Sequence, residues 1–351
     1  MPRTFSIAWR ASAVLICIAL MMGVPRPSSA QTEPDDDVVP FLTLRNQTGA
    51  DVPADLFGDE RSVLSAGRCR VGELDFRGLS SLAAAAPPFI REEFLFVDDV
   101  AMVEPARIFD GLQSSADAPA MYVHGYYIGF EKGCRRAALL RNNANLAGRF
   151  LWFSWPSDGS LASYIHDEAD LYWSVPDIAD AIIELERRFG GGAADVIGHS
   201  LGARGIVLAL YEVASREPDI RLDEVVLLAP DMDFGIFQRL LPRIRGIVDN
   251  ITIYVTTGDR PLAISAQLHG YPRLGQAGND VETLEGVEVI DLSDLPSDSP
   301  TGHLYHIYNP IVGRDLDQLL NGGLHAAERR NLHVTGHNLW RLRGTDGDSM
   351  D

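Results

Sequence analysis

The stretch that most constrains the fold is 193–208, which reads AADVIGHSLGARGIVL. The apolar residues before the glycine are typical of a short buried strand, and the small and aliphatic residues after it are typical of a helix. Gly198 and Gly202 flank Ser200 in a G-x-S-x-G pattern, which predicts a sharp strand-to-helix turn with the serine hydroxyl above the sheet. Such a serine can act as a nucleophile, although a buried serine in a tight turn would give the same pattern.

Short apolar segments alternate with helical patterns on both sides of this turn. We expect strands at 121–123, 150–153, 225–228, 251–256 and 287–290, and helices near 128–147, 176–189, 234–241 and 304–320. We expect a loop at 157–173, with Pro176 opening the helix after it. The alternation predicts the α/β-hydrolase fold, a mostly parallel sheet with helices on both faces, whose ligands bind at the carboxyl ends of the strands.

Three residues at those strand ends predict acyl-transfer chemistry. Ser200, Asp259 and His303 follow one another in the order serine, acid, histidine that this fold uses. A serine hydroxyl is a weak nucleophile until an imidazole takes its proton, and the imidazole needs a carboxylate to fix its tautomer.

Alternatives exist for two of these roles. Asp231 and Asp233, which follow the preceding strand, compete with Asp259 for the role of the acid, and any of the three could simply cap the next helix. His306 competes with His303 for the role of the base. The H-x-x-H spacing of these two histidines could suggest a metal, but no third ligand stands in a recognisable pattern, so we expect no metal and no organic cofactor.

An oxyanion formed during acyl transfer needs N–H donors that are already in place. Leu201, directly after the serine, supplies one from the start of its helix. The turn after the strand at 121–123 supplies the other, from the backbone N–H of Tyr126 or, alternatively, of Tyr127.

Six segments between 105 and 320 resemble the bacterial lipase-like α/β hydrolases grouped as a family of unknown function. They are VHGY at 123–126, FSWPSDG at 153–159, GHSLGAR at 198–204, APDMD at 229–233, TIYVTTGDRPL at 252–262 and GHLYH at 302–306. The resemblance implies the same assignment of Ser200, Asp259 and His303. Tyr127 is a departure, because an asparagine is more usual at that place.

The first 30 residues have the features of an export signal. Arg3 and Arg10 precede an apolar run of fourteen residues at 11–24, and small residues end the segment at Ala30. We therefore expect a signal peptide at 1–30, either cleaved or kept as an anchor, and a periplasmic or secreted protein. We further expect an N-terminal extension with extra strands at 31–115, the hydrolase domain at 116–320 and a tail at 321–351.

Charge and cysteine content limit the partners and the compartment. The net charge is −19, and it becomes −22 without 1–30, which disfavours nucleic acid and anionic lipid as partners. Cys69 and Cys134 remain after cleavage and are candidates for a disulfide, with two separate buried thiols as the alternative.

These patterns predict a serine hydrolase that cleaves a small-molecule or lipid ester through an acyl-enzyme, without a membrane span in the mature chain. The alternatives are an acyltransferase, a thioesterase or a peptidase with the same triad, and a binding protein that has lost catalysis. The sequence gives neither the acyl-chain preference nor the oligomeric state.

Overall fold

The computed structural model describes residues 37–344 except 77–80, 82–83, 113–118 and 298. The expected signal peptide lies outside the described residues. Residues 36–351 form one unit by their internal contacts, and this unit is described here by itself. In the part of the chain that is described, no helix combines the length and apolar character needed to cross a membrane.

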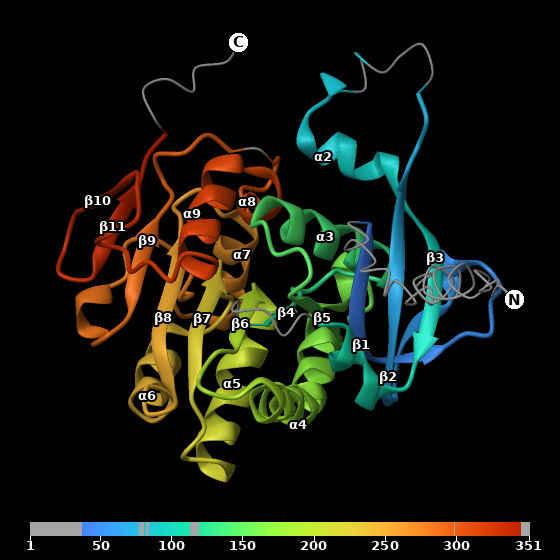
Figure 1. The fold of residues 1–351 in the computed structure, drawn as a ribbon. Helices are drawn as coiled ribbons and strands as arrows, with labels where there is room; N and C mark the ends of the chain where they lie inside the picture. Colours follow the sequence, from blue (N-terminus) through green and yellow to red (C-terminus); the bar gives the residue numbers. More distant parts are fainter. Residues whose placement is uncertain (1–36, 77–80, 82–83, 113–118, 298, 345–351) are drawn as a thin grey trace, which may run out of the picture. The chain divides into compact units, whose positions relative to one another are not determined.

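A single sheet runs through the unit (Figure 1). Its strands lie in the order β10-β11-β9-β8-β7-β6-β4-β5-β1-β2-β3. Neighbours from β11 to β1 pair in parallel, whereas β2 and β3 at one edge and β10 at the other pair antiparallel. The strands are β1 Val38–Gln47, β2 Phe57–Glu73, β3 Leu95–Val103, β4 Ala120–Val123, β5 Phe150–Ser154, β6 Asp195–His199, β7 Leu222–Leu228, β8 Val248–Val255, β9 Glu288–Asp291, β10 Leu332–Val334 and β11 Leu339–Leu342.

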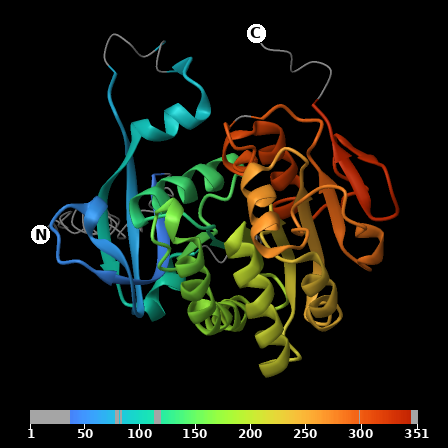
Figure 2. The same cartoon turned by 180° about the vertical axis from the view of Figure 1, so that it is seen from behind.

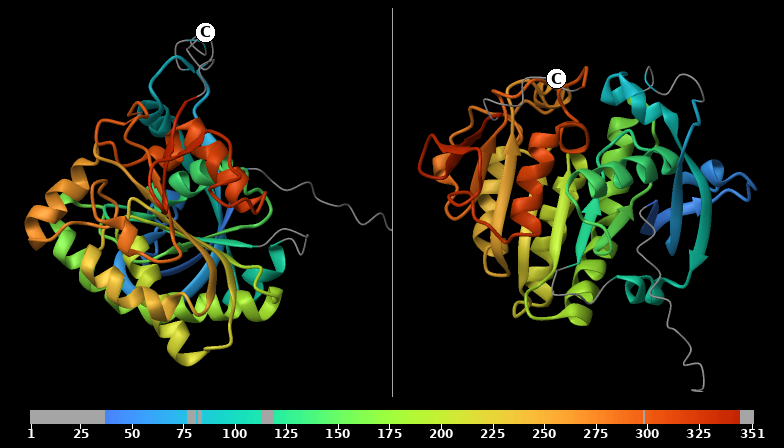
Figure 3. Two further views of the ribbon diagram at one scale, coloured as in Figure 1. Left: turned by 90° about the vertical axis from the view of Figure 1, so that its left-hand side faces the viewer. Right: turned by 45° about the horizontal axis from the view of Figure 1, so that its top comes forward.

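Helices cover both faces of this sheet (Figures 2 and 3). Alternate residues of one strand belong to different cores. Met121 and Val123 of β4 belong to the core that contains residues of α4, α5 and α6, and Tyr122 belongs to the core that contains residues of α3 and α9. The fold is therefore the α/β-hydrolase fold that the sequence predicts. The helices are α2 Pro88–Arg91, α3 Phe130–Asn143, α4 Tyr164–Phe189, α5 Leu201–Arg216, α6 Phe234–Ile244, α7 Arg260–His269, α8 Tyr305–Tyr308 and α9 Pro310–Leu320.

The prediction that Pro176 opens a helix after a loop is wrong. Helix α4 begins at Tyr164 and carries Pro176 in its interior. Proline removes one backbone donor from a helix, which is costly where the freed carbonyl is buried. Pro176 and Tyr172, four residues earlier, are both exposed, so water can replace the missing bond.

Both flanking segments contribute strands to the sheet. In the N-terminal extension, β1 inserts between β5 and β2, with Phe41 opposite Trp152. The segment 321–351, which we expected to be a tail, carries β10 and β11, and Trp340 lies opposite Ile290 of β9. Strands of three and four residues are too short to show a clear alternation in sequence, which explains the difference.

A disulfide between Cys69 and Cys134 joins β2 to α3. Both cysteines are fully buried, within the core formed on the α3 side of the sheet. The bond therefore ties the N-terminal extension to the helix that follows β4.

Candidate active site

Ser200 lies in the turn between β6 and α5. Its φ of 53° and ψ of −119° lie in a region that residues with a side chain rarely adopt. Two backbone bonds hold the residue there: its N–H donates to the Leu228 carbonyl at 2.9 Å, and its carbonyl accepts from the Asp231 N–H at 3.0 Å. The turn is thus fixed by the neighbouring strand β7.

Close backbone approaches explain two glycines at this turn. A Cβ on Gly202 would lie 2.2 Å from the carbonyl oxygen of His124, so α5 could not approach the end of β4 with any other residue there. A Cβ on Gly125 would lie 2.9 Å from the Cβ of Ser200. The turn after β4 therefore packs directly against the serine.

Asp259 and His303 meet at the ends of β8 and β9. The Nδ1 atom of His303 lies 2.6 Å from Oδ2 of Asp259, and both residues are buried. Oδ1 of the same carboxylate caps α7 by accepting from the Leu262 N–H at 2.9 Å. Gly302 makes the approach possible: its φ is 68°, and a Cβ there would lie 2.4 Å from the Gly258 carbonyl oxygen. The carboxylate thus both caps a helix and orients an imidazole.

The competing acids are engaged elsewhere. Although burial opposes ionisation, Arg204 and Arg273 hold the pKa of Asp231 below its usual value, and Arg273 Nε donates to its carboxylate at 2.7 Å. Asp233 caps α6 through the Ile236 N–H at 2.8 Å. Neither contacts an imidazole in a described hydrogen bond.

Three further imidazoles surround the serine turn. Burial lowers the pKa of His199 and of His306 well below the usual value, and it lowers the pKa of His124 to about 3. Nε2 of His199 lies 3.1 Å from the carbonyl oxygen of His303, and the His199 ring contacts those of His303 and His306 at 4.6 and 4.2 Å between centroids. His199 and His306 thus pack the His303 loop against the serine turn, whereas His124 stacks on Trp155.

The Ser200 hydroxyl makes no hydrogen bond within the described residues. The hydrogen bond between a nucleophile and its general base is often long in a free enzyme and shortens when substrate binds.

The N–H groups predicted as oxyanion donors differ in their hydrogen bonding. The N–H groups of Tyr126 and Leu201 have no hydrogen-bond partner among the described residues, whereas the Tyr127 N–H donates to Asp167 at 3.3 Å. Of the two candidates in the turn after β4, Tyr126 is therefore the one whose donor is available.

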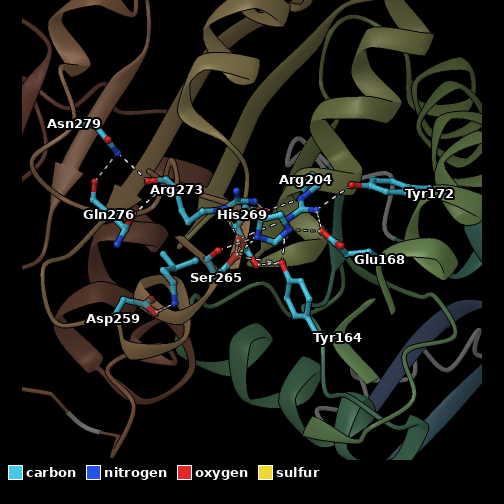
Figure 4. A network of polar contacts seen from close by, with 12 residues as sticks. Tyr164, Glu168, Tyr172, Arg204, Asp259, Ser265, His269, Arg273, Gln276 and Asn279 are labelled. Carbon is cyan, nitrogen blue, oxygen red and sulfur yellow. Dashed lines mark hydrogen bonds and ion pairs between the residues drawn. The ribbon is translucent and has the colours of Figure 1, made fainter. Parts of the chain in front are cut away.

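A polar network beside the serine turn was not predicted from the sequence (Figure 4). Arg204, one turn into α5, donates to Glu168 and to the hydroxyls of Tyr164 and Tyr172 on α4. His269 of α7 reaches Glu168 at 3.0 Å. A pocket of about 470 Å³ opens beside this network. The spacing of four residues between the three α4 side chains was the signal, because it places them on one helix face.

One group in the described residues has the composition of a metal site. Ligand atoms of His166, Asp167 and Asp170 lie within 4.8 Å of one another. Asp170 accepts from Arg61 at 2.5 Å, however, and Asp167 accepts three hydrogen bonds from protein donors. Protein donors thus occupy both carboxylate oxygens of Asp167, whereas Oδ2 of Asp170 has no hydrogen-bond partner among the described residues and lies 3.4 Å from Nδ1 of His166.

A parallel sheet covered on both faces, with a strained serine after a central strand, defines an α/β hydrolase. The model of the family described as alpha/beta hydrolase of unknown function (DUF900) matches residues 106–321, and the chain belongs to this family. No curated relative matches the sequence.

The comparison with solved structures found several chains that are similar to this one at low identity. Carboxylesterase CesB from Bacillus subtilis is 15% identical, with 59% of this chain and 85% of that chain covered and a TM-score of 0.33. A hormone-sensitive lipase from a metagenome library is 14% identical, covering 74% and 100%, with a TM-score of 0.37. Lipase B from Aspergillus fumigatus is 15% identical, covering 60% and 54%, with a TM-score of 0.37.

Proposed function

We propose that the protein is a serine hydrolase that cleaves carboxylic esters through an acyl-enzyme. Ser200 is the nucleophile, His303 is the base and then the acid, and Asp259 orients His303. The observation that carries the proposal is the 2.6 Å contact between His303 and Asp259 beside a serine held at a φ of 53°. Backbone strain at a non-glycine residue is typical of functional sites, which supports a catalytic role for Ser200.

The proposed reaction proceeds in two halves. His303 Nε2 takes the proton of Ser200 Oγ as this oxygen attacks the ester carbonyl, and the resulting oxyanion accepts hydrogen bonds from the N–H groups of Tyr126 and Leu201. His303 then protonates the leaving alcohol as the C–O bond breaks. In the second half, water gives a proton to His303 as it attacks the acyl-enzyme. His303 then returns this proton to Ser200 Oγ as the bond between the acyl carbon and that oxygen breaks and the carboxylic acid leaves.

A small-molecule or lipid ester is the substrate class that these features favour. The rings of Tyr126 and Tyr164 pack edge to face at 5.2 Å beside the proposed oxyanion donor, which supplies an aromatic wall for an acyl group. Trp155, which directly follows β5, is fully buried against His124 and is not part of this wall.

Export to the periplasm or the medium is part of the proposal. The charge and apolar run at 1–30 support it, and so does the disulfide between Cys69 and Cys134, because such bonds persist in oxidising compartments.

Labelling with a fluorophosphonate tests the nucleophile. The wild-type protein should be modified, and Ser200→Ala should not be. Labelling that persists in this variant would show that another serine reacts, and an unlabelled wild-type protein would favour a binding protein without catalysis.

A substrate panel tests the reaction class. Hydrolysis of p-nitrophenyl esters of increasing acyl length should exceed hydrolysis of matched thioesters and peptides, and product analysis with an added alcohol should show acid as the main product. A main product that is a new ester would make the protein an acyltransferase.

A further inference from the structure

Several main-chain polar groups of the turn at 124–128 are held by hydrogen bonds, whereas the proposed oxyanion donor has no partner among the described residues. Trp155 Nε1 donates to the His124 carbonyl at 2.7 Å, and the Ile128 N–H donates to Ser157 Oγ at 3.0 Å. The Tyr127 N–H donates to Asp167, and the Ile128 carbonyl accepts from a guanidinium at 2.5 Å. A turn held in this way keeps the Tyr126 N–H in a fixed place.

Asp167 of α4 is the anionic part of this support. Its side chain is fully buried, and it accepts from the Tyr127 N–H at 3.3 Å, from Ser157 Oγ at 2.5 Å and from the Asp158 N–H at 2.9 Å. Tyr127 has a φ of 65°, which is unfavourable for a residue with a side chain. The bond to Asp167 therefore stabilises a conformation that the residue would otherwise leave.

Arg45 of β1 is the cationic part. It is 1% exposed and donates to Ser154 Oγ at 2.9 Å, to the Ser157 and Gly58 carbonyls at 2.9 and 3.0 Å, and to the Ile128 carbonyl. Burial lowers the pKa of Arg45 to about 10, against the opposing charge of Asp167. The guanidinium remains charged at neutral pH, and its bonds join the end of β5 to the end of the turn.

We propose that Arg45 and Asp167 are positioning residues that hold the turn at 124–128 so that the Tyr126 N–H faces the oxyanion. The inference rests on the proposed function. Neither residue touches the reacting atoms, so each acts through the backbone of the turn.

Arg45 lies outside the part of the chain that the family model matches. The family model covers 106–321, and Arg45 lies before it, on a strand of the N-terminal extension. The extension therefore contributes to the proposed site as well as to the sheet. A preorganised donor is worth roughly 10² to 10³ in kcat, and small displacements of such a group are costly.

Asp167→Asn tests the anionic part. Oδ2 of Asp167 accepts from Tyr127 and Ser157, and Oδ1 accepts from the Asp158 N–H, so an asparagine must turn its NH₂ group toward one of these two sets of donors. We expect kcat for p-nitrophenyl butyrate to fall about 10- to 100-fold with KM unchanged within about threefold, because the oxyanion forms only after substrate binds. Affinity for an alkyl boronic acid, which forms a tetrahedral anion on the serine, should fall in parallel.

Asp170→Asn is the matched control. Asp170 is also buried, lies one turn further along α4 and bonds to Arg61 of the same N-terminal extension, but it does not contact the turn. Its kcat and boronate affinity should stay within about threefold of wild type. A similar loss of kcat in both variants would assign the effect to a general loss of packing and would overturn the inference.

Two further measurements separate the possible failures. If Asp167→Asn does not fold, Ser157→Ala removes the hydroxyl that bridges Asp167 and Ile128, and it should show the same loss of kcat at unchanged KM. A folded variant with wild-type kcat and boronate affinity would contradict the positioning role alone. A wild-type protein that fluorophosphonate does not label would contradict the proposed function and this inference with it.

Discussion

Asp259→Asn separates the two contacts of one carboxylate. Asparagine can still accept from the Leu262 N–H and cap α7, since it is as good a capping residue as aspartate. Its amide NH₂ would face His303 Nδ1, which must then be unprotonated, so the ring proton moves to Nε2 and the imidazole can no longer take the proton of Ser200. The fold should be kept while turnover is lost.

The expected magnitudes follow from these two contacts. We expect kcat for p-nitrophenyl butyrate to fall roughly 10²- to 10⁴-fold, which is about 3 to 5 kcal/mol of transition-state stabilisation. The free energy of unfolding should change by less than about 1 kcal/mol. Asp259→Ala should lose the same turnover and, in addition, about 1 kcal/mol of stability from the missing cap.

Asp233→Ala is the control for the capping contribution. It removes the cap of α6 in the same way but contacts no imidazole, so it should lose about 1 kcal/mol and keep its turnover. Hydrolysis assays and urea unfolding measure both quantities. A folded Asp259→Asn variant that keeps turnover within about threefold of wild type would refute the role of this carboxylate, and a selective loss in Asp231→Asn would move that role to the earlier strand.

Three more predictions concern the rest of the molecule. Burial, together with the charge of Asp195, raises the pKa of Glu224 to about 8, so its protonated form is favoured in the folded state and stability should fall by up to about 1.4 kcal/mol per pH unit between roughly pH 4.5 and 8. Glu224→Gln should flatten this part of the stability curve, and an unchanged curve would contradict it. Reduction of the disulfide between Cys69 and Cys134, which closes a loop of 65 residues, should cost about 4 kcal/mol in urea unfolding, and no change would contradict this value. Gly125→Ala places a Cβ 2.9 Å from the serine Cβ and should abolish fluorophosphonate labelling, whereas normal labelling would place the turn elsewhere.

Local chemistry made the centre of the fold predictable. The elbow at Ser200 could be predicted because a strand, two glycines and a helix are adjacent in sequence, and the acid and base could be narrowed to a few residues because they follow strands. The sequence favours Asp259 but leaves Asp231 as an alternative, because both follow parallel strands. Their surroundings differ in the structure, where Asp259 contacts His303 and Asp231 is bound by Arg273.

Contacts between distant segments could not be predicted. Arg45 and Asp167 are 122 positions apart, and each stands in a stretch whose pattern gives no sign of a buried charge. The part of helix α4 before Pro176 was not predicted because proline in a helix interior is rare, and its tolerance depends on exposure, which the sequence does not give.

The insertion of β1 between β5 and β2 decides where this protein can be divided. A fragment cut to the boundaries 106–321 would leave the hydrogen-bonding edge of β5 bare and would lack the guanidinium that closes the turn after β4. Screening, crystallisation or engineering of a shortened enzyme should therefore begin ahead of residue 38, because the segment outside the recognised family region supplies an interior part of its architecture.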